Sequence, residues 1–248
     1  MKLNEELISS EERLKEALNT KNKFFTIIAH DLRSPIVGFL QLAKLLSEEI
    51  NNISINDLSE ISKTLYLSAD KLYKLLENLL EWSFIQQSQI EIVPKRIRLL
   101  EVLNDVFQYL DQVAKNKNIS IETNIEPDIY AFADQNMLDL IFRNLISNAV
   151  KFSNKGGKII VNCDVSEKYE DKYLISVKDF GIGIDSNLAA NLFRIDKRTQ
   201  RVGTQGEDGS GLGLILTKEF VTRHDEEIWV ESSVAEGTTF YFTIKRFF

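Results

Sequence analysis

The chain has 248 residues, of which 44% are hydrophobic and 27% are charged. This composition is typical of a folded globular protein and excludes a chain that is mainly disordered. Its 30 basic and 37 acidic side chains give a net charge of −7, which argues against a general nucleic-acid binder, because such proteins carry a basic excess. The amino terminus lacks the apolar core of a signal peptide, no apolar run reaches about 18 residues, and Cys163 is the single cysteine. These features predict a cytoplasmic location.

Hydrophobic residues recur three and four positions apart in the first third of the chain, which predicts two amphipathic helices. The first apolar seam consists of Leu3, Leu7, Ser10, Leu14, Ala17, Lys21, Phe24 and Ile28, and the second of Leu58, Ile61, Leu65, Ser68, Leu72, Leu75, Leu79 and Trp82. The polar segment 51–56 predicts the turn of a helical hairpin. One hairpin cannot bury both seams, so we expect two copies to form a four-helix homodimer.

The rest of the chain predicts a second domain of different architecture. Pro94 would end a continuing helix, so we expect a linker at residues 89–98. Beyond it, the patterns predict helices at 99–117, 135–152, 187–193 and from 212, with strands at 119–125, 129–133, 158–165, 173–179, 228–232 and 238–245. This order predicts an α/β sandwich, in which helices cover one face of a sheet. The expected domains are a signalling coiled-coil helix (1–22), the hairpin (23–88), the linker and the sandwich (99–248).

His30 is the first residue with a chemical pattern around it. It lies roughly 200° around the helix from Ile28 and therefore faces away from the seam. Pro35 has no amide hydrogen for the carbonyl of Asp31, which predicts a kink just after the histidine. Asp31 can hold the proton of one ring nitrogen and leave the other nitrogen as a nucleophile. The same position also fits an ordinary histidine on a solvated helix face.

Asn144, Asn148 and Lys151 lie on one face of the helix predicted at 135–152, because they are spaced four and three residues apart. Carboxamide oxygens suit Mg²⁺ and an ammonium suits phosphate. An asparagine pair that caps or bridges helices is the alternative.

Seven of the eleven glycines fall between residues 181 and 213. Asp179 ends a predicted strand just before Gly181 and Gly183, where a carboxylate could accept from the amino group of adenine, although a simple turn would look the same. A second glycine group opens the helix expected from residue 212, where backbone amides favour phosphate. This group consists of Gly209, Gly211 and Gly213. It lacks the Gly-Lys-Ser/Thr of a Walker A loop and the context of a dinucleotide fingerprint.

Taken in order, these motifs resemble those of sensor histidine kinases. The similar segments are the H-box (30–35), the N-box (144–152), the G1 box (179–184), part of the F-box (192–193), the G2 box (209–214) and a final strand with Gly-Thr (236–240). The resemblance covers residues 20–248. It implies a helical hairpin that forms a dimeric four-helix bundle, followed by an α/β sandwich of the Bergerat ATP-binding type.

The resemblance implies autophosphorylation of His30 from Mg²⁺ and ATP, followed by phosphoryl transfer to an aspartate in the receiver domain of a response regulator. It implies that Asp31 orients the histidine. It also implies that Asp179 accepts a hydrogen bond from the adenine amine and that Asn148 holds the Mg²⁺. Asn144 would be a direct or indirect partner of that metal, and Lys151 would contact phosphate. The remaining implied ATP-binding residues are Gly181, Gly183, Gly209, Gly211, Leu212, Gly213 and Thr238.

Residues 195–208 resemble the mobile ATP lid of the family. Phe193 is expected to anchor the base of the lid by packing. Arg198 and Arg201 could reach the γ-phosphate, but a solvated charge run is the preferred interpretation of both.

Three departures from the family pattern stand out. Ser34 occupies a position where members with strong phosphatase activity carry Thr or Asn, which leaves phosphatase activity open. The usual His-Gly-Gly turn is His224-Asp225-Glu226, with His224 expected to be structural. Asp196 replaces the second phenylalanine of the F-box. The last two changes bear on lid packing and turn geometry rather than on chemistry.

Two other functions stay open at this level. One is an ATP-hydrolysing clamp of the wider superfamily that includes gyrase and mismatch-repair ATPases, but those use an acidic residue where this chain has asparagines. The other is an idle dimerisation and signal-relay module, against which the full set of nucleotide residues argues. The register of residues 1–22 further predicts a preceding sensor module, which could be carried by a membrane.

Overall fold

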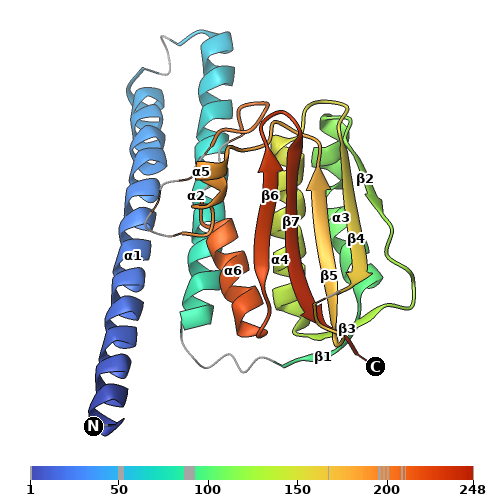
Figure 1. Cartoon of the computed structure of the whole chain (residues 1–248). Helices are drawn as coiled ribbons and strands as arrows, with labels where there is room; N and C mark the ends of the chain where they lie inside the picture. Colours follow the sequence, from blue (N-terminus) through green and yellow to red (C-terminus); the bar gives the residue numbers. More distant parts are fainter. Residues whose placement is uncertain are drawn as a thin grey trace. The chain divides into compact units, whose positions relative to one another are not determined.

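The computed structural model describes residues 2–49, 53–86, 93–166, 168–194, 197, 199, 201–207, 209 and 211–247. The chain forms two compact units, Met1–Ile90 and Glu91–Phe248 (Figure 1). None of the helices in the described ranges combines the length and hydropathy needed to span a bilayer.

The first unit consists of two long helices, α1 (Lys2–Glu49) and α2 (Ile55–Gln86). α1 runs without interruption across the expected boundary at residues 22 and 23 and continues through Pro35. α2 begins with a side-chain cap, in which the amide of Asp57 donates to Ser54 Oγ at 3.2 Å and the Ser54 hydroxyl donates to the carboxylate of Asp57 at 2.7 Å. Residues 51 and 52 of the expected turn lie outside the described residues.

The two helices pack against each other, which confirms the helical hairpin. Ile28 of α1 and Leu75 of α2 are buried at 4% and 2% exposure. The other seam positions of α2 whose side chains are described are all half-buried; these are Leu58, Ile61, Leu65, Ser68, Leu72 and Leu79. Trp82 and the first-seam residues before Ile28 lie outside the described side chains. The second seam therefore has the burial that its spacing predicts.

The second unit is built on a mixed β-sheet. Within its described residues, five strands pair in the order β2 (Ser120–Thr123), β4 (Lys158–Val165), β5 (Lys172–Asp179), β7 (Gly237–Lys245) and β6 (Ile228–Ser233). β2 and β4 are parallel, and the other pairs are antiparallel. The register places Asp179, the last residue of β5, opposite Thr238 near the start of β7.

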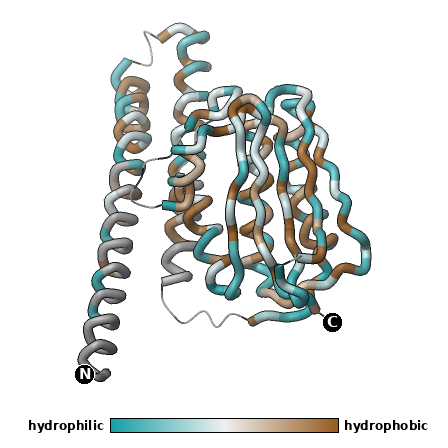
Figure 2. The backbone as a smooth tube through the Cα atoms, viewed as in Figure 1, coloured by the Kyte–Doolittle hydropathy of each residue, from teal (hydrophilic) through white to brown (hydrophobic). Residues whose placement is uncertain are grey.

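Helices cover one face of this sheet and confirm the predicted α/β sandwich (Figure 1). α3 (Leu99–Asn116), α4 (Gln135–Phe152) and α6 (Gly213–Arg223) pack in that order, and α5 (Ser186–Ala189) is a single turn beside β6. Hydrophobic residues recur along the strands that these helices cover (Figure 2). Phe142 of α4 meets Phe242 of β7 edge-to-face, with ring centroids 5.5 Å apart. This packing fixes the position of α4 on the sheet.

A short strand lies in the segment that the sequence assigned to the linker. β1 (Lys95–Arg98) pairs antiparallel with β3 (Tyr130–Ala133), and Ile97 is buried opposite Ala131. The described part of the expected linker therefore belongs to the second unit, because one apolar side chain and a partner strand are enough to fix it. Residues 87–92 lie outside the described residues.

Candidate functional site

Asp179 lies at the end of β5 with its side chain almost completely buried, at 3% exposure. Burial raises the pKa of this carboxyl to about 6, although hydrogen bonds from the backbone of Gly181 and Thr238 act in the opposite direction. The Gly181 amide donates to Oδ1 at 2.9 Å. A buried carboxylate with a raised pKa at a strand end is a candidate for ligand binding.

The loop after Asp179 is wedged between the end of α4 and the β6–β7 turn. Gly183 has φ +61°, and a Cβ there would lie 1.9 Å from the carbonyl oxygen of Ser233. The amide of Ile182 donates to the carbonyl of Phe152 at 3.2 Å, and its own carbonyl accepts from Ala235 at 2.9 Å. Glycine is therefore required at 183 for both conformation and space.

Asn144 joins α4 to the start of α6. Its amide donates to Thr217 Oγ1 at 2.5 Å, and the Thr217 hydroxyl donates to the carbonyl of Gly213 at 2.9 Å. A Cβ on Gly213 would lie 2.3 Å from Asn144 Oδ1, which shows how closely the amide approaches the glycine loop. Asn148 lies one turn further along α4 and is half-buried. The amide of Asn144 thus bridges two helices, while Asn148 lies nearer the carboxyl end of α4.

Lys151 lies beside the second glycine group. A Cβ on Gly209 would be 2.5 Å from Lys151 Nζ, and the ammonium also lies 4.8 Å from the ring centre of Phe152. Gly211 has φ +71°, and the side chain of Leu212 is fully buried before α6 begins. The structure therefore brings the N-box lysine and the second glycine group together.

The lid segment has described contacts at its base and at Arg201. Phe193 packs edge-to-face on Phe240 of β7 at 6.3 Å, as expected for an anchor. Arg201 Nη1 donates to the carbonyl of Gly183 at 3.0 Å, which links the lid to the G1 loop. Asp196 and Arg198 lie outside the described residues.

Thr238 is buried behind Asp179. Its hydroxyl lies 2.9 Å from Ser232 Oγ, which in turn donates to the carbonyl of Gly237 at 2.7 Å. The Ser232 hydroxyl also accepts from the amide of Ile184 at 3.0 Å. These bonds fix the strand ends around the carboxylate of Asp179.

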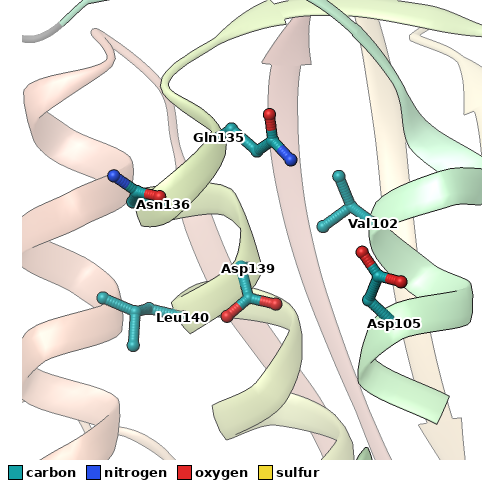
Figure 3. A pocket seen from close by; sticks show the side chains of 6 residues that line it. All are labelled: Val102, Asp105, Gln135, Asn136, Asp139 and Leu140. Carbon is teal, nitrogen blue, oxygen red and sulfur yellow. The ribbon is translucent and has the colours of Figure 1, made fainter. Parts of the chain in front are cut away.

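A hollow of about 290 Å³ lies elsewhere on the second unit, between α3 and α4 (Figure 3). It is lined by Val102, Asp105, Gln135, Asn136, Asp139 and Leu140. The carboxylate of Asp139 is paired with Arg143 at 2.6 Å. This hollow contains none of the predicted ATP-binding residues, and its acidic lining does not suit phosphate.

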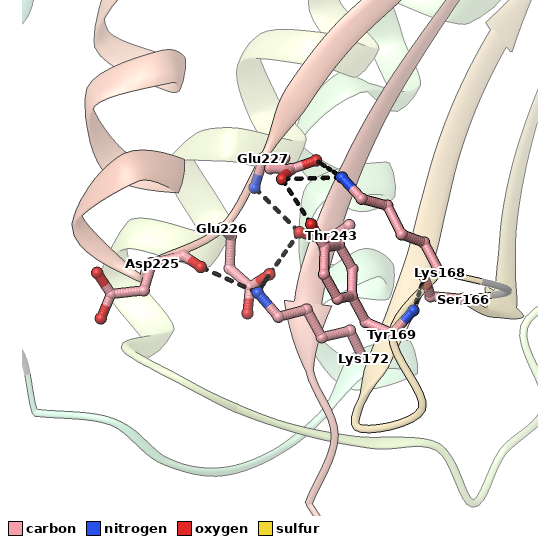
Figure 4. A network of polar contacts seen from close by, with 8 residues as sticks. All are labelled: Ser166, Lys168, Tyr169, Lys172, Asp225, Glu226, Glu227 and Thr243. Carbon is pink, nitrogen blue, oxygen red and sulfur yellow. Dashed lines mark hydrogen bonds and ion pairs between the residues drawn. The ribbon is translucent and has the colours of Figure 1, made fainter.

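The replacement of the family's His-Gly-Gly turn has a structural explanation (Figure 4). Asp225 adopts φ +58°, a conformation that glycine takes more readily. Glu226 is buried and pairs with Lys172 at 2.9 Å, and it also accepts a hydrogen bond from the hydroxyl of Thr243. Lys172 Nζ donates further to the carbonyl of Asp225 at 3.0 Å. A buried ion pair thus lies where the family motif has its second glycine.

His224 is structural, as predicted. Its Nε2 accepts the amide of Asp134 at 3.0 Å, so the proton is on Nδ1, which donates to the carbonyl of Phe220 at 2.8 Å. Both ring nitrogens are thus occupied by backbone groups, and the imidazole joins α6 to the start of α4.

The side chain of His30 lies outside the described side chains, so its outward direction stays a prediction. The residues one turn before and after it on α1 are Thr26, Arg33 and Ser34, and all three are exposed. Asp31 is half-buried, and Pro35 is buried. The helix face that carries position 30 is therefore open at its described positions.

No group of three or more His, Cys, Asp or Glu side chains within the described ranges is arranged to hold a metal ion.

Sequence reasoning missed four residues that shape this site. Lys117, Thr204 and Glu207 join the end of α4 to the lid, and Thr217 bonds Asn144. Their spacing from the motifs gives no signal, because contacts between distant segments bring them there.

Comparisons with known proteins agree with this geometry. Residues 133–247 match the family of histidine kinase-, DNA gyrase B- and HSP90-like ATPases, and residues 20–88 match the His Kinase A (phospho-acceptor) domain. The sandwich is thus an ATP-binding domain of that class. The chain carries both modules in order and belongs to the histidine kinases.

Two curated relatives illustrate the similarity. The chain is 30% identical over 234 residues to the autoinducer 2 sensor kinase/phosphatase LuxQ of Vibrio vulnificus (strain YJ016), which covers 92% of this chain and 27% of that protein. It is 29% identical to the sensor histidine kinase WalK of Bacillus subtilis (strain 168), covering 90% of this chain and 36% of that protein. The chain thus spans only about a quarter to a third of these relatives.

A solved structure supports the fold. The histidine kinase ThkA, crystallised in complex with the response regulator protein TrrA, superposes with a TM-score of 0.70 at 21% identity. The match covers 96% of this chain and 65% of that one.

Proposed function

We propose that the chain is the kinase core of a two-component sensor, which phosphorylates itself on His30 and passes the phosphoryl group to a response regulator. The observation that carries this proposal is the meeting of Asp179, the two glycine loops and Lys151 at one end of the sandwich, in a chain with a phosphoacceptor hairpin. Membership of the histidine kinase family supports the same function.

Each group at this end has a role that fits its chemistry. The buried carboxylate of Asp179 accepts from the adenine amine, and Thr238 keeps that strand end in place. Gly181 and Gly183 let the backbone approach the nucleoside. The loop from Gly209 through Gly211 and Leu212 to Gly213 offers backbone amides to the phosphates at the amino end of α6, and Lys151 adds a positive charge.

The residues present fit a Mg²⁺ ion bound together with the nucleotide. Asn148 offers a carboxamide oxygen on the α4 face that also carries Lys151, and Asn144 steadies the start of α6 through its hydrogen bond to Thr217, which bonds the carbonyl of Gly213. Mg²⁺, when bound, neutralises negative charge on the phosphates. This role leaves the positioning of the reacting groups to the protein.

The proposed reaction has two balanced steps. A ring nitrogen of His30 forms a bond to the γ-phosphorus while the bond from that phosphorus to the β,γ-bridging oxygen breaks, which releases ADP. Asp31 orients the imidazole by accepting a hydrogen bond from the other ring nitrogen. An aspartate of the receiver domain then takes the phosphoryl group and leaves His30 free.

The proposal includes a homodimer, a response regulator and a sensor module before residue 1. Exposed apolar side chains on α2 support the homodimer. The greater length of the relatives supports additional modules. The crystallised complex of ThkA with the response regulator protein TrrA supports a partner of that kind for this chain.

Incubation with ATP labelled at the γ-phosphate tests the function. The wild type should become labelled with acid-labile, alkali-stable phosphate, and His30→Ala should not. The matched control is His224→Gln, because His30 and His224 are the two histidines of the chain, and it should keep the label. Equal labelling of His30→Ala would contradict the proposal. Rapid ATP turnover that does not depend on His30 would favour a superfamily ATPase instead.

A further inference from the structure

Lys117 is a buried lysine at the end of α3 that belongs to none of the motifs. Its side chain is 2% exposed, and its ammonium donates to the carbonyls of Val150 and Lys151, each at 2.9 Å. These carbonyls belong to the last turn of α4, where no later turn supplies amides to bond them. Lys117 therefore caps the helix that carries Asn148 and Lys151.

The same ammonium holds a turn of the chain just before the glycine loop. It donates to Thr204 Oγ1 at 2.8 Å and pairs with Glu207 Oε1 at 2.6 Å. The other carboxylate oxygen of Glu207 accepts from the amide of Gln205 at 2.7 Å, and the backbone carbonyl of Glu207 accepts from the amide of Gly203 at 2.8 Å. We refer to residues 203–207 as the Thr204 turn.

The Thr204 turn is also bonded directly to the end of α4. The amide of Thr204 donates to the carbonyl of Lys151 at 3.1 Å, and its hydroxyl donates to the carbonyl of Ser153 at 2.7 Å. Gly209 follows Glu207 by only two positions in the sequence, and it lies against the ammonium of Lys151. The position of the turn therefore sets where the glycine loop starts relative to Lys151.

Charge strengthens this arrangement. The carboxyl end of a helix carries about half a negative charge, which would repel a triphosphate, and the ammonium of Lys117 lies on that end. Burial by itself raises the pKa of Glu207, but the hydrogen bond from Lys117 and the amide of Gln205 outweigh it and leave the pKa below its usual value. Glu207 is thus ionised at neutral pH, and the ion pair persists under assay conditions.

We propose that Lys117 is a positioning residue for the triphosphate: it holds the Thr204 turn on α4, so that Lys151 and the Gly209–Gly213 loop meet the phosphates together. Lys117 itself touches only protein groups. The inference rests on the proposed ATP binding, but the hold on the turn can be measured without nucleotide.

Calorimetric binding of ATP and of adenosine to the full chain separates positioning from general damage. Lys117→Met should weaken ATP binding about tenfold or more, since it removes a charged hydrogen-bond donor, and should change adenosine binding less than about twofold. Glu207→Gln should weaken ATP binding by a smaller factor. The matched control is Lys158→Met, which removes a surface ion pair with Glu122 at 2.7 Å on the sheet edge and should change neither ligand.

Parallel loss of ATP and adenosine binding would overturn the proposal, because it would show a purely structural role. Unchanged ATP binding in Lys117→Met would overturn it as well. If that variant does not fold, Glu207→Gln and Thr204→Val carry the same comparison.

Amide hydrogen exchange without nucleotide provides the independent measurement. In Glu207→Gln and Lys117→Met, the amides of Gly203 and Thr204 should exchange about tenfold faster or more, while those of β7 keep the wild-type rate. Unchanged exchange at these amides would contradict the proposal that Lys117 keeps the Thr204 turn on α4. Failure of the wild type to bind ATP would instead contradict the proposed function. The exchange result would then still show whether Lys117 keeps the turn in place.

Discussion

At the scale of single residues, Asp179 shows a conflict between stability and binding. The carboxylate is buried where adenine is proposed to bind, and its pKa is raised from 3.8 to about 6. Between these two values the folded state keeps the proton that the unfolded state releases. The free energy of unfolding therefore decreases as the pH rises through this window.

The predicted consequence is that Asp179→Asn stabilises the nucleotide-free chain at neutral pH. The gain should be at most about 3 kcal/mol at pH 7, from a shift of roughly two units, and should vanish near pH 4, while ATP binding is lost. This gain in the free energy of unfolding can be measured by denaturant unfolding, with the fluorescence of Trp229 as the signal in a Trp82→Phe background. The exposed Glu126→Gln is the control, and a gain that does not change with pH would refute the explanation.

At the scale of secondary structure elements, the α6–β6 turn shows how a departure from the family is accommodated. The buried pair of Lys172 and Glu226 lies 17% and 3% exposed, whereas Lys168 and Glu227 in the same network form an exposed pair at 3.1 Å. Removing one partner of a buried pair leaves an uncompensated charge, while an exposed pair contributes little.

Lys172→Met should therefore destabilise the second unit by about 3 kcal/mol, and Lys168→Met should leave the unfolding midpoint nearly unchanged. The same fluorescence measurement applies to both. Equal effects of the two substitutions would mean that the burial of Glu226 does not control this turn. Adding Glu226→Gln to Lys172→Met should recover part of the loss, because the amide still bonds Thr243 without a charge.

These elements also show what the sequence could predict. The bounds of α4 agree with the predicted 135–152, because its apolar spacing is regular and Asp134 caps its first turn. β1 could not be recognised, because Lys95–Arg98 contains one apolar residue and gains its structure from β3. Asp179, Lys151 and the glycine loops could be singled out as candidates because they stand in motifs whose order and spacing resemble those of a known family. The burial of Lys117 depends on partners up to ninety positions away, such as Glu207.

At the scale of the whole molecule, the first unit leaves apolar side chains uncovered. Tyr66, Tyr73, Leu76 and Leu80 lie on one stripe of α2 and are 71%, 60%, 49% and 49% exposed. Their spacing of seven, three and four residues is that of a second helical seam. A partner hairpin would bury this stripe, which favours the proposed homodimer over a lone hairpin.

The double substitution Leu76→Glu and Leu80→Glu should convert the dimer to a monomer, because it places two charges within the stripe. Light scattering of the full chain measures the mass. Val234→Glu changes another exposed apolar residue, on the β6–β7 turn, and should leave the mass unchanged. A dimer that survives the double substitution would place the interface elsewhere.

The unbroken course of α1 has a mechanical consequence. From Lys2 to His30 the helix offers no hinge, so these 28 steps form a rod of about 42 Å. A rigid rod transmits torque along with displacement, and a quarter-turn imposed at its start would turn position 30 by the same angle. The imidazole that we propose to be phosphorylated would then change its direction in step with a rotation imposed at the amino end of α1.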